Sequence, residues 1–116
     1  IIPAMVKQNG ELMMSYGVMG GQYQPAGHVR VLSNLIDYGV DIQEAIDWPR
    51  SFSDSTGLLL ENGYNEKVAS KLTQMGHNVI RPKGPLGGAQ SILIDNKLGV
   101  LTGGSDPRKD GLALGY

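Results

Sequence analysis

The stretch that decides the fold is Gly17-Val18-Met19-Gly20-Gly21, followed by Gln22-Tyr23-Gln24-Pro25 and an apolar run over residues 29–36. It has the pattern of a strand that ends in a glycine turn, from which a helix begins. Such a turn directs backbone N–H groups and the positive end of the helix dipole at one point. A point of that kind can hold an anion, or an oxyanion that forms only during a reaction. From these residues alone, a tight connection between strand and helix is the commoner explanation.

The residues on either side of this turn predict a hairpin and a helix. Residues 1–7 and 11–16 are apolar runs separated by Asn9-Gly10, a dipeptide typical of a two-residue hairpin turn. In the helix that follows, Pro25 stands in or near the first turn, where its missing N–H costs little, and Gly39 ends the helix. The apolar positions at helical spacing predict a buried face made of Val29, Leu32, Leu35 and Ile36.

The middle of the chain predicts two further helices. Asp41 and Glu44 have the spacing of a capping box, and the helix that they begin runs to about Asp47, because Pro49 disfavours helical backbone at the residue before it. A second helix is expected from Asn65, as its N-cap, to Met75, with Val68, Leu72 and Met75 as its apolar stripe. Around these helices we expect a polar loop over residues 51–56, a buried strand over 58–61 and a strand over 77–81.

The last third of the chain predicts a second hairpin, with strands over residues 89–94 and 97–102 joined across Asp95-Asn96. Residues 103–108 then form a turn-rich ending, and residues 112–116 form a tail. Hairpins with helices in blocks between them indicate an α+β fold with a largely antiparallel sheet covered by helices.

Glycine is unusually frequent, with 17 residues in a chain of 116. The glycines cluster at Gly20-Gly21, Gly87-Gly88 and Gly103-Gly104. Because glycine permits positive φ and close backbone approach, the chain is expected to turn sharply or to lie against another segment at each of these places.

Composition excludes several functions. Ten basic and eleven acidic residues nearly balance and no basic block occurs, which argues against nucleic-acid binding and against a polybasic membrane patch. There is no cysteine for thiolate catalysis or metal binding, and His28 and His77 lie far apart, so we expect neither a metal site nor a cofactor. No stretch approaches the ~20 apolar residues of a membrane span.

The first residues lack the basic region of a signal peptide and resemble the middle of a strand, so we expect a fragment or processed subunit. The compartment, cytoplasmic or exported, stays open.

Six motifs in register over nearly the whole chain resemble the γ-glutamyltranspeptidase family. They are Gly20-Gly21, residues 35–41 (LIDYGVD), 44–50 (EAIDWPR), 75–79 (MGHNV), 89–92 (AQSI), and 105–108 (SDPR) with Asp110-Gly111. The resemblance implies the N-terminal nucleophile hydrolase fold, an αββα sandwich of two antiparallel sheets between helical layers. It also implies a precursor that cleaves itself into a large and a small subunit. The new N-terminal threonine of the small subunit is the nucleophile and its α-amino group is the base. The γ-glutamyl group then passes to this threonine, and from it to water or to an acceptor amine.

By this resemblance, residues 1–116 form a single partial domain, the C-terminal part of the small subunit. The partners are then the remainder of the same precursor and a γ-glutamyl small-molecule substrate. Gly20 and Gly21 match the glycine pair whose N–H groups form the oxyanion hole. Met19, Gly87 and Gly88 are expected to border the substrate pocket.

The chain departs from the transpeptidases that it most resembles at one point: Val18-Met19 stands where they have Ser-Pro before the glycine pair. The following Gln24-Pro25-Ala26-Gly27-His28 is similar to a divergent, transpeptidase-like or acylase-like branch. An acylase that cleaves another amide bond is therefore an alternative. A non-catalytic fragment that folds as a binding module is another, and a phosphate-binding loop ranks last, because the Lys-Ser/Thr of a P-loop is missing.

The remaining polar candidates favour structural roles. His28 is expected to be a hydrogen-bonded packing or capping residue, since the family mechanism needs no histidine. Arg50, and Arg108 with Asp106, are expected to act as structural clamps in preference to contacts with an anionic substrate. A homo-oligomer stays open.

Overall fold

The structure is a computed structural model that describes all residues 1–116. The chain forms two compact units, residues 1–47 with 87–116, and residues 48–86. We describe each unit by itself. That residues 1–116 are a single partial domain of a precursor stays a prediction.

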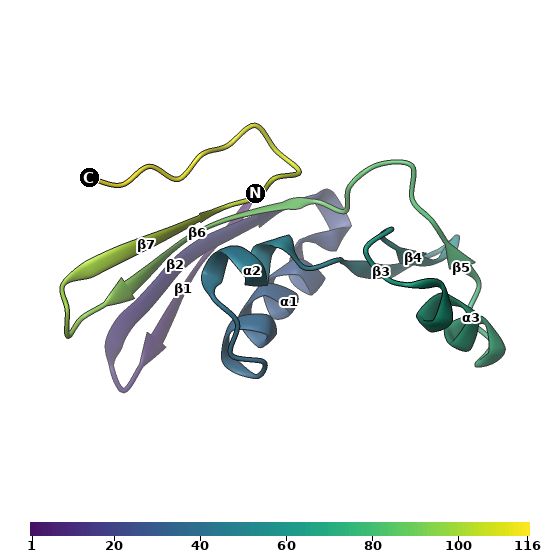
Figure 1. The fold of residues 1–116 in the computed structure, drawn as a ribbon, viewed down its shortest axis with the longest axis horizontal. Helices are drawn as coiled ribbons and strands as arrows, with labels where there is room; N and C mark the ends of the chain where they lie inside the picture. Colours follow the sequence, from purple (N-terminus) through teal and green to yellow (C-terminus); the bar gives the residue numbers. More distant parts are fainter. The chain divides into compact units, whose positions relative to one another are not determined.

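The first unit is built on an antiparallel four-stranded sheet in the order β1-β2-β6-β7 (Figure 1). Its strands are β1 (Ile2–Gln8), β2 (Glu11–Met19), β6 (Gly88–Asp95) and β7 (Val100–Ser105). The first predicted hairpin is confirmed. The second forms between β6 and β7, but its turn spans residues 96–99, so its second strand begins at Val100 and not at the predicted residue 97. In the first, Asn9 and Gly10 have φ values of 53° and 87°, the left-handed backbone that a tight two-residue hairpin turn requires.

One face of this sheet is covered by helices (Figure 1). They are the short 3₁₀ helix η1 (Gly21–Tyr23), α1 (Gln24–Ile36) and α2 (Ile42–Asp47). The predicted N-cap of α2 is confirmed, because Asp41 Oδ1 accepts from the Glu44 N–H at 2.8 Å. Between sheet and helices lies the core, made of Met14, Tyr16, Val18, Tyr23, Val31, Ile42, Ala45, Ile46 and Ala89.

The face by which α1 packs is not the predicted one. Val29 and Ile36 are 69% and 55% exposed, whereas Gly27, Val31 and Asn34 are buried. Asn34 is accommodated because its side-chain amide donates to the Ala45 carbonyl at 3.0 Å, which ties α1 to α2. A glycine and an asparagine carry no apolar signal, so the periodicity of large apolar residues pointed to the wrong stripe.

Gly103-Gly104 lies in a strand, which corrects the prediction that the turn-rich ending begins there. A Cβ at Gly104 would stand 2.8 Å from Ile46 Cδ1, and one at Gly103 would stand 2.9 Å from Ala113 Cβ. These glycines are needed because α2 lies directly on one face of β7 and the tail lies on the other. The chain was expected either to turn sharply or to lie against another segment at each glycine cluster. At Gly103-Gly104 the second of these holds, because other segments pack closely on both glycines.

The second unit contains β3 (Ser51–Asp54), β4 (Gly57–Leu60), β5 (Val79–Ile80) and α3 (Glu66–Gln74). Strand β4 pairs antiparallel with β3 and parallel with β5. The predicted polar loop over residues 51–56 is wrong, because β3 forms there at the edge of the sheet, where polar side chains can face water. Strand β4 is only partly buried, with Leu60 alone in the core.

Helix α3 begins as predicted. The Asn65 side chain accepts from the Val68 N–H at 3.0 Å, which satisfies one of the free donors of the first turn. The predicted stripe is more exposed than expected, since Met75 is 67% exposed and the buried residue of the helix is Ala69. None of the helices is long and apolar enough to cross a membrane.

Candidate active site

The glycine turn after β2 has the geometry that its sequence predicts. Met19 is the last residue of β2, and Gly20 precedes η1, which leads directly into α1. Gly20 and Gly21 have φ values of 125° and 58°, conformations that other residues rarely adopt. The turn therefore needs glycine at both positions, and it places their N–H groups at the start of a helical segment.

The second glycine cluster lies against the first. Gly88 pairs with Met19 in the ladder between β6 and β2. A Cβ on Gly20 would stand 2.7 Å from the Cα of Gly87. A Cβ on Gly87, where φ is 64°, would collide with the Met19 carbonyl and with the ring of Tyr23. The structure thus brings Met19, Gly20, Gly87 and Gly88 together, with Gly21 next in the chain.

The hydrogen bonds of this turn use its carbonyl groups. The Gly20 carbonyl accepts from the Tyr23 N–H at 3.1 Å, and the Gly21 carbonyl accepts from the Gln24 side chain at 3.0 Å. None of the hydrogen bonds in turns and loops has the N–H of Gly20 or Gly21 as its donor. Gly21 is exposed, and a Cβ there would meet nothing within 4 Å. Two N–H groups in this position can donate to an oxygen that carries negative charge.

Two side chains that the sequence did not single out border this cluster. Tyr23 is buried, and its ring packs against the positions where Gly27 and Gly87 lack a Cβ. The aliphatic stem of Lys109 lies against Gly88, with its Cγ 2.8 Å from the position of the missing Cβ. In the sequence, the only feature that could have pointed to Tyr23 is its position two residues after the glycine pair. The only feature that could have pointed to Lys109 is its position directly after the SDPR motif.

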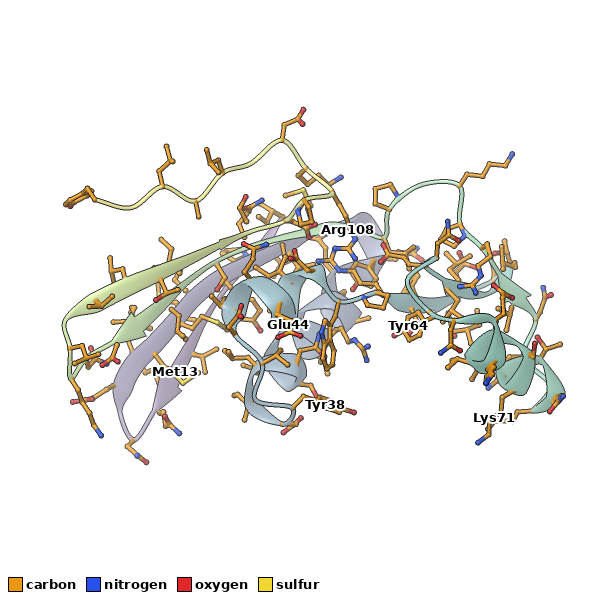
Figure 2. The ribbon with its side chains drawn as sticks, viewed as in Figure 1. Met13, Tyr38, Glu44, Tyr64, Lys71 and Arg108 are labelled. Carbon is orange, nitrogen blue, oxygen red and sulfur yellow. The ribbon has the colours of Figure 1, made fainter.

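Asp106 and Arg108 form the structural clamp that was expected. Asp106 is buried, and its carboxylate accepts from the N–H groups of Ala89 at 2.7 Å and Arg108 at 2.9 Å. The guanidinium of Arg108, which is labelled in Figure 2, contacts Asp106 at 3.2 Å and donates to the carbonyls of Ile46 and Asp47. Its donors are thus directed at groups of its own chain.

Arg50 and His28 also have structural partners. Arg50 is buried in the second unit, where its guanidinium donates to the Leu86 carbonyl at 2.8 Å. The two ring nitrogens of His28 lie 2.8 Å from the Gln24 carbonyl and 3.0 Å from the Ile2 carbonyl. The ring also packs on Tyr16, whose hydroxyl pKa is raised by burial. The prediction that His28 is a hydrogen-bonded packing residue is confirmed.

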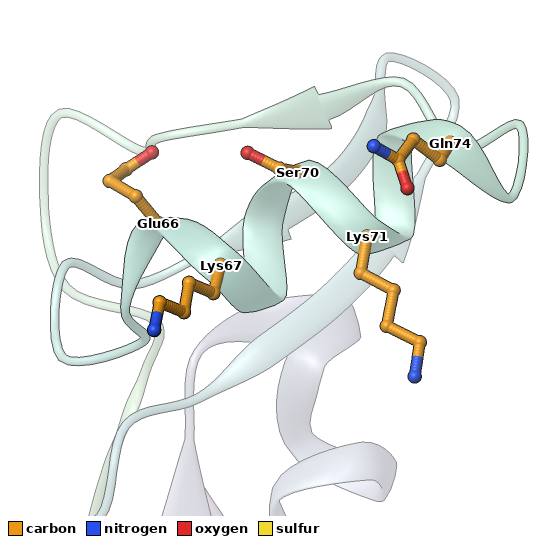
Figure 3. Close-up of a pocket in the computed structure, with 5 residues that line it drawn as sticks. All are labelled: Glu66, Lys67, Ser70, Lys71 and Gln74. Atoms are coloured by element: carbon orange, nitrogen blue, oxygen red, sulfur yellow. The ribbon is translucent and has the colours of Figure 1, made fainter.

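Two hollows of the surface lie in the second unit. One follows the exposed side of α3 and is lined by Glu66, Lys67, Ser70, Lys71 and Gln74 (Figure 3). A second lies beside residues 61–63 and 82–85. Both belong to the second unit and neither contains a predicted site residue. The first has only one helix for its wall, so we assign it no role. No group of three or more histidine, aspartate or glutamate side chains is arranged to hold a metal ion.

Comparison with known proteins identifies the family. The sequence profile described as "Gamma-glutamyltranspeptidase" matches residues 1–116. The glutathione hydrolase-like YwrD proenzyme of Bacillus subtilis is 36% identical, over 99% of this chain and 23% of that protein. Among solved structures, a cephalosporin acylase from Bacillus halodurans superposes with a TM-score of 0.88 at 35% identity, over 100% of this chain and 23% of that one. A point mutant of Helicobacter pylori γ-glutamyltranspeptidase superposes with a TM-score of 0.84 at 31% identity, over 93% of this chain and 60% of that one.

These likenesses define the class as the N-terminal nucleophile hydrolases, of whose fold the chain has the antiparallel sheet and the helices that cover it. The chain belongs to the γ-glutamyltranspeptidase family, whose members include glutathione hydrolase and acylase proenzymes. It spans about a quarter of the length of the curated relative that it matches at 36% identity.

Proposed function

We propose that the protein containing this chain is an N-terminal-threonine hydrolase or transferase of γ-glutamyl amide bonds, and that this chain supplies the oxyanion hole and its scaffold. The supporting observation is the turn at Gly20 and Gly21, whose N–H groups stand at the start of a helical segment and donate to no turn or loop carbonyl. The nucleophile comes from the remainder of the precursor. Relatives that are proenzymes, and of which this chain spans 23% or less, support that division.

In this proposal Gly20 and Gly21 act by electrostatic stabilisation of the transition state. When the threonine hydroxyl attacks the amide carbonyl, the carbonyl oxygen becomes an anion in the tetrahedral intermediate. The N–H groups of Gly20 and Gly21 donate to that oxygen and lower the barrier, because they are already oriented when the charge develops. Met19, Gly87 and Gly88 border the pocket, with the Gly87 backbone packed against Gly20 so that the turn is held in place.

The second candidate is an acylase of the same fold that acts on another amide. It is favoured by 35% identity to a cephalosporin acylase over the whole chain, and by Val18-Met19 in front of the glycine pair. Both candidates use the same oxyanion hole and differ in the acyl group. Assaying the full-length protein with a γ-glutamyl anilide and with anilides of other dicarboxylic and aromatic acids separates them, since the preferred acyl group has the higher kcat/KM.

The test of the oxyanion assignment is Gly20→Ala in the full-length, processed protein. A Cβ at this position is strained by its φ of 125° and stands 2.7 Å from Gly87 Cα, so the turn has to shift and take both N–H groups with it. We expect kcat to fall by about 100- to 1,000-fold, the typical cost of losing an oxyanion-hole donor, while KM changes little.

The matched control is Gly39→Ala, in the same unit. Gly39 also has a positive φ, 68°, but a Cβ there meets nothing within 4 Å. This variant should keep its kcat. The isolated chain, which lacks the nucleophile, should show no turnover and serves as the blank. Equal kcat for Gly20→Ala and Gly39→Ala would exclude the oxyanion assignment.

A further inference from the structure

Asp106 is an aspartate buried without exposure to solvent, with a carboxylate that holds several donors at once. Its Oδ2 accepts from Ala89 N at 2.7 Å, and its Oδ1 accepts from Arg108 N at 2.9 Å and from the Arg108 guanidinium at 3.2 Å. A buried carboxylate is costly unless it is paired and hydrogen-bonded, so this arrangement indicates a specific task for the residue.

The task is visible in the strand pairing. The ladder between β6 and β7 ends at the pair of Gln90 with Ser105. The residue of β6 that precedes Gln90 is Ala89. Its N–H donates to the side chain of Asp106, in place of the backbone carbonyl that would accept it if the ladder continued. Asp106 thus extends the pairing of β6 by one residue, toward Gly88 and Gly87.

This extension reaches the candidate oxyanion hole. Ala89 is buried, Gly88 pairs with Met19, and the Cα of Gly87 packs against the position where Gly20 lacks a Cβ. Gly87 in turn has no room for a Cβ between the Met19 carbonyl and the Tyr23 ring. The position of Gly20 therefore depends on the course of residues 87–89, and that course depends on the bond from Ala89 to Asp106.

The other side of the clamp is anchored to α2. Arg108 donates to the Ile46 carbonyl at 3.1 Å and to the Asp47 carbonyl at 3.3 Å. The Gln43 side chain exchanges two bonds with the backbone of Ser105, at 2.8 Å to its carbonyl and at 3.0 Å from its N–H. Asp106 is consequently held between two fixed points, which lets it act as a rigid support for residues 87–89.

We propose that Asp106 is a positioning residue for the oxyanion hole: through Ala89 and Gly87 it fixes where the N–H groups of Gly20 and Gly21 point. This inference rests on the proposed function, and it adds a residue that touches neither substrate nor reacting atoms. Misplacement of a catalytic group by about 1 Å can cost about a hundredfold in rate, so a distant support of this kind has a measurable effect.

The test is Asp106→Asn in the full-length, processed protein. The amide that replaces the carboxylate has one acceptor oxygen, so either Ala89 N or the Arg108 donors face an N–H₂ group in its place. The matched control is Asp95→Asn, at the opposite end of β6, where the carboxylate accepts from Lys97 N and Leu98 N, both at 2.9 Å. Two quantities are measured: amide hydrogen exchange of peptides covering residues 19–23 and 87–89, and kcat and KM corrected for the fraction of active sites.

We expect Asp106→Asn to speed exchange in both peptides and to lower kcat by about tenfold to a hundredfold with KM within about threefold, and Asp95→Asn to change neither. Unchanged exchange at residues 19–23 would overturn the proposal whatever the activity. Faster exchange with unchanged kcat would overturn the positioning role of Asp106. The oxyanion assignment is tested separately by Gly20→Ala, so a failure of this inference and a failure of the proposed function can be told apart. If Asp106→Asn does not yield processed protein, Arg108→Lys loosens the hold on Asp106 and should shift both readouts in the same direction. Unchanged exchange in that variant would overturn the proposal as well.

Discussion

Gly27 lies on the buried face of α1, where the helix packs directly on Val18 of β2. A Cβ there would stand 2.6 Å from Val18 Cγ1 and 2.6 Å from the Tyr23 ring. Tyr23 in turn packs against Gly87, so the close approach at Gly27 supports the same ring that borders the glycine turn. A single missing methyl group thus determines how near the helix can lie to the sheet.

Two opposing effects decide the outcome of Gly27→Ala. Alanine favours the helix by about 1 kcal/mol over glycine, whereas forcing a methyl group into a closely packed contact costs about 1–3 kcal/mol. We expect the cost of the close contact to exceed the gain in helix propensity, so that the substitution lowers the free energy of unfolding. The comparison is Ala26→Gly, one residue earlier on the exposed side, which loses helix propensity alone. Urea unfolding of the full-length protein measures both, and a stabilised Gly27→Ala variant would contradict the packing described for α1.

At the scale of elements, the turn between β3 and β4 is held by one carboxylate. Asp54 accepts from the Thr56 hydroxyl at 2.6 Å, from Thr56 N at 2.7 Å and from Gly57 N at 3.3 Å. The hydrogen bonds from Thr56 and Gly57 lower the pKa of Asp54 below its ordinary value of 3.8. Gly57 is required next to it, because a Cβ there would collide with the Asn78 carbonyl.

The lowered pKa of Asp54 determines how the stability of the fold depends on pH. Because the folded pKa is lowered, the contribution of Asp54 to stability is fully present above its unfolded value and is lost as the pH falls through the folded one. We expect the wild type to exceed Asp54→Ala in stability at pH 6, and the difference to shrink steadily below about pH 4. Thermal unfolding of both proteins across this range is the measurement. A difference that stays constant down to about pH 2 would contradict the role of the carboxylate.

At the scale of the whole molecule, the sheet of the first unit has two different faces. The helices cover the face of Tyr16 and Val18, and the opposite face carries Met5, Ile92 and Leu101, which are 71%, 47% and 67% exposed. The tail after β7 lies on part of this opposite face, against Gly103 (Figure 1). Because the chain spans 23% of a 36% identical relative, we propose that another part of the same precursor covers the rest of this face.

Ile92→Lys tests that proposal in the full-length protein. If the face is covered, the substitution buries an unpaired ammonium group, and we expect a loss of about 3 kcal/mol or more of stability, or a failure to accumulate processed protein. The control is Leu98→Lys, since Leu98 is 76% exposed in the turn between β6 and β7 and belongs to neither face. Thermal unfolding and the yield of processed subunits are measured, and equal behaviour of the two variants would mean that this face stays open to solvent.

Local chemistry was readable from the sequence by itself. The Asn9-Gly10 hairpin, the Asp41 and Asn65 caps and the glycine turn after β2 form where they were predicted, because each depends on backbone conformations and hydrogen bonds within a few residues. The family, too, was recognisable from short motifs in register. These features need no knowledge of which distant segment lies nearby.

The tertiary structure decided the features that depend on such a segment. It buries Asn34 and leaves Val29 exposed, since the close approach at Gly27 sets the rotation of α1. It keeps Gly104 in a strand, because α2 lies on it. It alone brings Gly87 and, through Ala89, Asp106 to the turn at Gly20. Contacts between segments far apart in the chain are made by shape and by buried hydrogen bonds, and neither leaves a periodic signal in the sequence.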